Sequence, residues 1–466
     1  MPNVYVLYWF DVEDCSVYQS DDANKRLANI LTNHGVRGPF KVVGQKARVL
    51  EQHVRYDVID AMKKHTIGFH SNWHGLRPQI AEYLGPLDWH EGVAEFDRRE
   101  TPGLADVRRL FGQYTATYGQ PGSNWAPHVF PVLRKWGIPT YVSGFGYIGV
   151  DCQPFWLGGI LCTSHMHGKR LSGETQGHLM GLNFELGKPG EIEKHKATFT
   201  RSLEQLSGTG GLISIINHPC SLVLEQWFST YMKSRELTEA GYKHFDEFVK
   251  WSVSHPNVKG TCAKDLLRLY PDRAQGRTFS RDELRALAAG LSNEVNFQRA
   301  GDAYVSASEA FGLLVNCLGA YAANAGLPAG VEYAAVYNPT RHPKATGSVS
   351  VSWPAFCEMT RSVMESVKRN REAPSSVEFK EGAIAPADYL AAVARVLVKL
   401  FKGEQPPDKV EIVPVERRFE SFVDEEAGRS AWKGTMMTSD FSAPKLIDLA
   451  KLVAWTVKPA ILQDIL

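Results

Sequence analysis

His70 and His74 lie four residues apart after a short apolar stretch, residues 66–69, and their type and spacing are typical of metal chemistry. If that stretch forms a strand, both imidazoles lie where the strand opens into a loop. Two neutral ring nitrogens held close together can bind one divalent ion. One oxygen ligand from elsewhere would complete a site that keeps a position open for water. The pair therefore predicts a metal centre at this strand end.

Carboxylates that could supply the oxygen ligand follow another apolar stretch, residues 4–10, as Asp11, Glu13 and Asp14. A further candidate is His218, which follows a third apolar stretch and precedes a proline. Taken singly, a histidine pair, an acidic cluster or a lone histidine is more often a turn, a helix cap or a hydrogen-bonded core residue. A site is favoured because all three follow predicted strands.

The elements that must position these side chains alternate between strand and helix. Helices are predicted at residues 21–35, 45–64 and 92–118. Strands are predicted at residues 4–10, 38–44, 66–69, 138–143, 158–162, 211–217 and 258–262. Counted with their helices, these segments give about seven or eight units, which suits a closed or nearly closed α/β barrel. In such a barrel the chemistry gathers at the carboxyl ends of the strands, where the acidic cluster and the three histidines would meet.

Composition excludes several classes of function. The chain of 466 residues has 52 Lys and Arg against 51 Asp and Glu, without a basic stripe, so nucleic-acid binding is not expected. No apolar stretch is long enough for a membrane span, and no secretory signal precedes the first predicted strand. The seven cysteines are odd in number, scattered and never C-x-x-C, which favours a reduced chain without a disulfide framework. A cytoplasmic location is therefore expected.

Over about 270 residues these motifs resemble the polysaccharide deacetylases of carbohydrate esterase family 4, whose domain is a distorted (β/α) barrel. The acidic motif Phe10-Asp-Val-Glu-Asp14 and the intact His70-Ser-Asn-Trp-His74 resemble the first two motifs of that family. Residues 40–48 resemble its second strand, and Ile215-Ile-Asn-His-Pro219 resembles its last motif. The final helix and strand, residues 245–270, are also similar.

The resemblance implies a role for each of these residues. Asp11 would be the general base and His218 the general acid. His70 and His74 would bind a divalent metal, with zinc as the expected ion, together with Glu13 or Asp14; we lean towards Asp14. The implied activity is hydrolysis of a carbon–nitrogen bond, the removal of N-acetyl groups from an amino-sugar-containing glycan or glycan precursor. A carbohydrate is thus the expected substrate.

Two features of the family pattern are missing. The segment that corresponds to the third motif, residues 119–125, lacks the arginine that pairs with the base. The aspartate of the fourth motif is not evident either, although Asp151 is a candidate. Trp125 and Trp156 could line a sugar site because aromatic faces stack on sugar rings, but core packing is the commoner fate of a tryptophan.

Two other functions stay open because of these departures. One is a catalytically impaired protein that binds glycans or serves as a scaffold. The other is hydrolysis of a different linear or cyclic amide bond on the same barrel.

The tail, residues 273–466, has a different pattern from the barrel at residues 1–272. Three apolar helices each run into a Pro-x-x-Val ending, which gives repeats at about residues 306–331, 352–377 and 385–410. Such units commonly stack on their neighbours, so a mainly helical repeat domain is predicted. The copies faintly resemble the pseudomurein-binding repeat, which implies a cell-wall or protein partner. A structural role or a homo-oligomer is an equal alternative.

Overall fold

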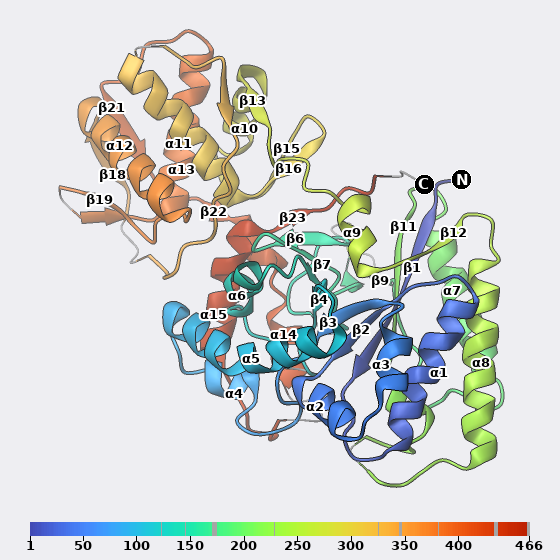
Figure 1. Cartoon of the computed structure of the whole chain (residues 1–466). Helices are drawn as coiled ribbons and strands as arrows, with labels where there is room; N and C mark the ends of the chain where they lie inside the picture. Colours follow the sequence, from blue (N-terminus) through green and yellow to red (C-terminus); the bar gives the residue numbers. More distant parts are fainter. Residues whose placement is uncertain are drawn as a thin grey trace.

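The computed structural model describes residues 1–463 apart from residues 123, 145, 170–174, 228, 325, 344–346, 381 and 433–436. In the first 270 residues most strands join one curled sheet that is surrounded by helices (Figure 1). Within the described residues, eight strands run parallel in the spatial order β10-β11-β1-β2-β3-β4-β5-β7, and a ninth, β12, pairs in parallel with β1. This α/β architecture confirms the distorted (β/α) barrel predicted from the sequence.

The elements of the barrel follow the predicted alternation. Its parallel strands are β1 (Val4–Val12), β2 (Pro39–Val42), β3 (Thr66–Phe69), β4 (Thr117–Tyr118), β5 (Thr140–Tyr141), β7 (Ile160–Cys162), β10 (Leu179–Gly181), β11 (Gly211–Asn217) and β12 (Val258–Thr261). β6 (Phe155–Leu157) is antiparallel to β7, and β8 (His167–Lys169) and β9 (Thr175–Gly177) pair with each other in antiparallel orientation. Its helices are α1 (Gln19–Asn33), α2 (Gly44–Gln52), α3 (Tyr56–Met62), α4 (Ile80–Leu84), α5 (Trp89–Phe111), α6 (Val129–Trp136), α7 (Glu191–Gln205), α8 (Arg235–Val253) and α9 (Ala263–Leu269).

Strand β1 separates two apolar layers because successive side chains of a strand point to opposite faces. Its even-numbered residues pack under the helices, in the core that contains most of their apolar side chains. Tyr5, Leu7 and Trp9 instead pack inside the barrel with residues such as Leu212. Asp11 continues this odd-numbered series, so the alternation directs its carboxylate into the mouth of the barrel.

The helix predicted over residues 45–64 is divided into α2 and α3. Val54 has a left-handed backbone conformation, with φ of 56°, which ends the first helix. The next residue, Arg55, is buried and forms ion pairs with Asp22 and Asp57. These ion pairs hold the chain where the second helix begins, and they involve residues that a local pattern does not connect.

A separate lobe follows the barrel and is built around helices α10 to α13 (Figure 1). Its helices are α10 (Arg281–Gly290), α11 (Ala307–Asn324), α12 (Trp353–Asn370) and α13 (Pro386–Phe401). Its strands are β13 (Thr278–Ser280), β14 (Glu294–Val295), β15 (Gln298–Ala300), β16 (Ala303–Val305), β17 (Gly330–Glu332), β18 (Val349–Ser352), β19 (Val377–Phe379), β20 (Gly382–Ile384), β21 (Lys409–Ile412) and β22 (Glu416–Arg417). The three Pro-x-x-Val endings lead into β17, β19 and β21, and each of these strands pairs with a strand that precedes a helix.

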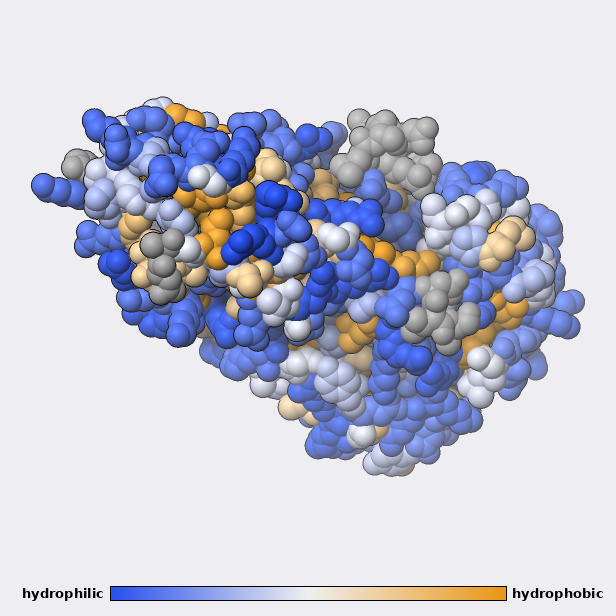
Figure 2. Space-filling model, turned by 90° about the horizontal axis from the view of Figure 1, so that it is seen from above, coloured by the Kyte–Doolittle hydropathy of each residue, from blue (hydrophilic) through white to orange (hydrophobic). Residues whose placement is uncertain are grey.

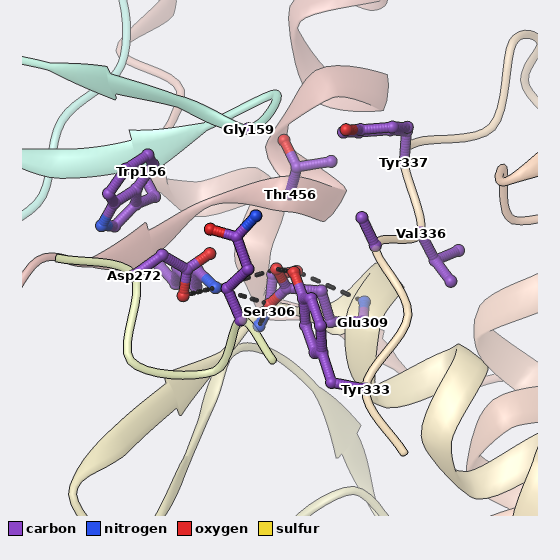
Figure 3. A pocket seen from close by; sticks show the side chains of 12 residues that line it. Trp156, Gly159, Asp272, Ser306, Glu309, Tyr333, Val336, Tyr337 and Thr456 are labelled. Atoms are coloured by element: carbon purple, nitrogen blue, oxygen red, sulfur yellow. Dashed lines mark hydrogen bonds and ion pairs between the residues drawn. The ribbon is translucent and has the colours of Figure 1, made fainter. Parts of the chain in front are cut away.

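The last part of the chain returns from the lobe to the barrel through α14 (Glu425–Trp432), α15 (Pro444–Val453) and β23 (Lys458–Pro459). Strand β23 joins the barrel sheet beside β6. The buried ammonium of Lys458 pairs with Asp272 and Glu309 at 2.8 Å each. These two carboxylates and Tyr333 line a cavity of about 80 Å³. Figure 3 shows how their side chains lie. We still propose a domain boundary near residue 272, but only between the barrel and the lobe. The segment that follows the lobe packs on the barrel.

No helix in the described ranges is long and apolar enough to cross a membrane. The face shown in Figure 2 is mainly hydrophilic, and its hydrophobic residues are visible chiefly where the surface is recessed.

Candidate metal centre and active site

The acidic cluster and the three histidines meet at one edge of the sheet. Asp11 lies near the end of β1, with Glu13 just beyond it, and His70 directly follows β3. His218 directly follows β11, which pairs with β1 in parallel. The carboxyl ends of parallel strands share one edge of a sheet, so these side chains converge although up to about 200 residues separate them in the chain.

The closest cluster consists of Glu13, His70 and His74. The Glu13 Oε2 atom lies 3.2 Å from His70 Nε2 and 2.9 Å from His74 Nε2. Each of the three side chains is at most 6% exposed. One carboxylate oxygen and two imidazole nitrogens therefore face a common point that is largely shielded from solvent.

Hydrogen bonding fixes which nitrogen of His70 is free for a ligand. The Nδ1 atom lies 2.8 Å from the carbonyl oxygen of Gly119, so Nδ1–H donates there and Nε2 turns its lone pair towards Glu13. Burial lowers the pKa of His70, which favours the neutral ring that a metal requires. Burial also disfavours the charged ring of His74, but the Glu13 carboxylate outweighs it and raises the pKa of His74.

This donor set fits a divalent ion. A lone pair of His70 and a carboxylate oxygen face each other, and only a proton or a cation between them makes that arrangement favourable. Bonds of 2.0–2.2 Å at tetrahedral angles place two ligand atoms about 3.4 Å apart, close to the separations around Glu13 Oε2. Two imidazoles and one carboxylate are also a ligand set that catalytic zinc sites use.

Asp14 points elsewhere. Its two carboxylate oxygens accept hydrogen bonds from the backbone amides of Ser16 and Val17, at 3.3 Å each. In the described residues, the groups that could hold a metal contain Glu13 and not Asp14. The geometry thus favours Glu13 as the carboxylate ligand, although we leaned towards Asp14 from the sequence.

Asp11 is held by a residue that the sequence motifs did not indicate. Lys41 lies opposite Asp11 in the register of β1 and β2, and its Nζ atom is 2.8 Å from Asp11 Oδ1. The two side chains are 1% and 7% exposed. Burial raises the pKa of Asp11, but the neighbouring His70 ring and the Lys41 ammonium outweigh it and lower the pKa well below its usual range. Asp11 is therefore ionised.

His218 faces the other oxygen of Asp11. Its Nε2 atom is 3.4 Å from Asp11 Oδ2, and its Nδ1 atom is 3.1 Å from the side-chain oxygen of Asn183. The ring of Trp227 packs edge-on against the imidazole at 4.4 Å. One nitrogen is thus occupied by a neutral partner, and the other points at the acidic cluster.

The loop that carries His70 and His74 rests on helix α5. The buried Glu100 accepts a hydrogen bond of 2.6 Å from the amide of Asn72, and the side chain of Asn72 donates to the carbonyl oxygen of Arg99. Arg48 of α2 donates to the Asn72 side chain at 3.1 Å. Sequence patterns gave no sign of these supports, because helix and loop are about 28 residues apart.

The remaining predicted site residues lie elsewhere. Trp125 is 1% exposed and is stacked between Tyr147 and Trp432. Trp156 packs in the barrel interior and borders the cavity of Figure 3. Asp151 is exposed in a turn, whereas Asn183 is the residue that contacts His218.

No family model and no curated protein matches this chain. Among solved structures, a Mycobacterium smegmatis protein assigned as a polysaccharide deacetylase has 15% identity, and the match covers 57% of this chain and 90% of that one, with a TM-score of 0.39. The Puue allantoinase has 12% identity, and the match covers 57% of this chain and 89% of that one, with a TM-score of 0.39. A family 4 acetyl xylan esterase from Clostridium thermocellum, solved with a cobalt ion, has 12% identity. This match covers 57% of this chain and 90% of that one, with a TM-score of 0.32. Values this low carry no functional argument, so we infer function from the side chains.

Proposed function

We propose that this chain is a metal-dependent hydrolase that removes N-acetyl groups from an amino-sugar-containing glycan or glycan precursor. The observation that carries the proposal is the position of Glu13 Oε2, 3.2 Å and 2.9 Å from the facing nitrogens of His70 and His74. The Asp11 carboxylate and the His218 ring lie beside this cluster, so an ion held there would have a base and an acid next to it.

In this proposal Glu13, His70 and His74 hold a divalent ion, with zinc as the expected metal. When bound, such an ion lowers the pKa of a water molecule and polarises the acetamido carbonyl. The N-acetyl substrate follows from the motif resemblance, and the three-ligand set supports hydrolysis.

The protein side chains move the protons. Asp11 is ionised and shares its Oδ1 with Lys41, which leaves Oδ2 to accept a proton from the attacking water. His218, when protonated, donates from Nε2 to the leaving nitrogen as the carbon–nitrogen bond breaks. Asn183 accepts from Nδ1 and orients the ring for that transfer.

Replacing both metal-binding histidines tests the proposal. We expect His70→Ala with His74→Ala to lose the bound divalent ion and to reduce deacetylation of chitin oligomers and peptidoglycan fragments to background. The melting temperature should stay near that of the metal-free wild type, because a site at a barrel mouth rarely holds the barrel together. Metal content is measured by elemental analysis of the same preparations.

His53→Ala is the matched control, since His53 lies at the surface after α2 with 47% of its side chain exposed. It should retain metal and activity. Stoichiometric metal in the double variant would contradict the site. A wild type that binds metal but deacetylates none of the substrates would favour a binding or scaffold protein instead.

A further inference from the structure

Lys41 is a charged residue enclosed within the barrel. Its ammonium is 2.8 Å from Asp11 Oδ1, donates to the carbonyl oxygen of Val142 at 2.9 Å and lies 4.0 Å from the centre of the Trp9 ring. A carboxylate, a carbonyl oxygen and an aromatic face each attract a cation, so these three contacts favour the charged form of the side chain. Only 1% of the side chain is exposed, so Lys41 has no role at the surface.

Two glycines make the space for this side chain. Gly68 lies beside Lys41 in the register of β2 and β3, and a Cβ atom at that position would come within 2.8 Å of Lys41 Cγ. At Gly119, a Cβ atom would overlap the ammonium itself. The absence of a side chain at Gly68 and Gly119 therefore leaves the space in which Lys41 reaches Asp11 Oδ1.

Both carboxylates of the site are close enough to compete for one ion. Asp11, Glu13 and His218 offer ligand atoms that all lie within 4.8 Å of one another, as do Glu13, His70 and His74. A carboxylate that binds a metal directly is a poor proton acceptor. The proposed reaction therefore needs one carboxylate on the ion and the other kept off it.

We propose that Lys41 is a positioning residue that assigns these roles: it holds Asp11 away from the metal as the base and leaves Glu13 as the carboxylate ligand. The inference deepens the proposed function and rests on it. Charge supports it, because Lys41 offsets one of the two carboxylates, so the cluster attracts a divalent ion less strongly with Lys41 than without it. Removing the ammonium releases Asp11 to join the ion.

The test is a cobalt titration of the full-length apoprotein, because the visible absorption of Co²⁺ reports its coordination geometry. For Lys41→Met we expect affinity for Co²⁺ to rise about tenfold, a change typical of groups around a metal site. Absorption per ion should fall as Asp11 adds a ligand. Turnover on chitin oligomers should fall about 10²-fold or more, with little change in KM, because the base is lost.

A double-variant comparison separates this role from simple structural support. In an Asp11→Asn background, Lys41→Met should leave the cobalt spectrum unchanged, since the carboxylate that could join the ion is gone. Lys41→Gln provides a second neutral variant, and its side chain can still donate to Asp11. It should lie between wild type and Lys41→Met in both readouts.

Lys458→Met is the matched control, because Lys458 is an equally buried lysine paired with carboxylates that are not part of this site. Its cobalt spectrum should equal that of the wild type. An unchanged spectrum in both Lys41 variants would overturn the inference, as would a spectral change of Lys41→Met that persists in Asp11→Asn. A wild type that binds Co²⁺ but does not deacetylate would contradict only the proposed function, since the spectra still decide the role of Lys41.

Discussion

His218 has two polar neighbours that divide its ring nitrogens between positioning and chemistry. Asn183 takes Nδ1, and Nε2 faces Asp11 at 3.4 Å. A histidine that served only the core would bury both nitrogens among structural partners. Its place beside the acidic cluster instead suits a group that delivers a proton to substrate.

We predict that His218→Asn folds and binds metal normally but loses about two to four orders of magnitude in turnover, the usual contribution of positioned acid–base catalysis. Asparagine keeps a polar side chain of similar size but cannot donate that proton. Thermal midpoint and turnover should be measured on one preparation.

His34→Asn is a suitable comparison, since His34 directly follows α1 and its partly exposed ring pairs with Asp246 of α8, which is not a residue of the candidate site. It should keep full turnover. An unstable but fully active His218→Asn protein would remove His218 from the mechanism.

Candidate site residues at or near the end of a strand could be predicted from the sequence. A candidate site residue within a strand could not. Asp11, His70 and His218 could be grouped because parallel strands bring their ends together. Lys41 carries a weaker signal, a lysine within the apolar run of β2, and its partner Asp11 is 30 residues away on another strand. Trp125 was misleading, because the ring that covers it belongs to a residue about 300 positions later.

Helix α5 supports the loop that carries His70 and His74. Glu100 and Gly103 lie three residues apart and face the same loop residue, Asn72. A Cβ atom at Gly103 would come within 2.6 Å of the Asn72 Cα, so the helix and the loop are in direct backbone contact. The carboxyl group of Glu100 is nearly inaccessible to water, and burial raises its pKa to about 7.

This pKa predicts a pH-dependent stability. An acid whose pKa is raised from 4.5 to about 7 on folding disfavours the folded state increasingly as the pH rises through that window. Glu100→Gln removes the charge. We expect its free energy of unfolding, relative to the wild type, to increase by about 3 kcal/mol between pH 4.5 and pH 8. Urea unfolding at several pH values measures the difference.

Glu95→Gln on the same helix is the control. Salt bridges with Arg98 and Arg99 lower the pKa of Glu95 to about 2, so its contribution to stability is lost only as the pH falls below about 4.5. Between pH 5 and pH 8 the difference from the wild type should be constant. Parallel curves for Glu100→Gln and the wild type would contradict the predicted ionisation of Glu100.

Helices and strands with a clear hydrophobic periodicity could be predicted from the sequence. The break within the helix predicted over residues 45–64 could not. Helix α1 and strands β3 and β11 lie within about two residues of the predicted segments. The break at Val54 depends on ion pairs of Arg55 with residues of α1 and α3, which no local pattern contains. Likewise, a Pro-x-x-Val ending signals the end of a helix, but which strand it then pairs with is set by packing in the lobe.

The segment that follows the lobe packs against the barrel. Trp432 of α14 stacks on Trp125 with ring centroids 4.6 Å apart, and the indole nitrogen of Trp125 donates to the carbonyl oxygen of Gly428. Trp125 belongs to the segment that begins at Gly119, whose carbonyl oxygen fixes His70. The end of the chain thus supports the wall of the candidate site.

We predict that Trp432→Ala lowers the free energy of unfolding by about 3–5 kcal/mol, the usual cost of truncating a large buried aromatic side chain. Denaturant unfolding followed by circular dichroism measures the loss. Trp353→Ala, in the partly buried start of α12, removes a ring of the same size from the lobe and should cost less. Equal, small effects of both variants would show that α14 adds little to the barrel.

The pairing of β23 with β6 also determines when the protein can finish folding. Roughly 300 residues lie between these two strands, so a ribosome that adds 5–20 residues per second needs about 15–60 s to complete the second after the first. During that time the outer edge of β6 lacks its native partner, and unpaired strand edges promote association with other chains. The lobe is thus an insertion that delays the pairing of β6 until residues 458–459 have been synthesised.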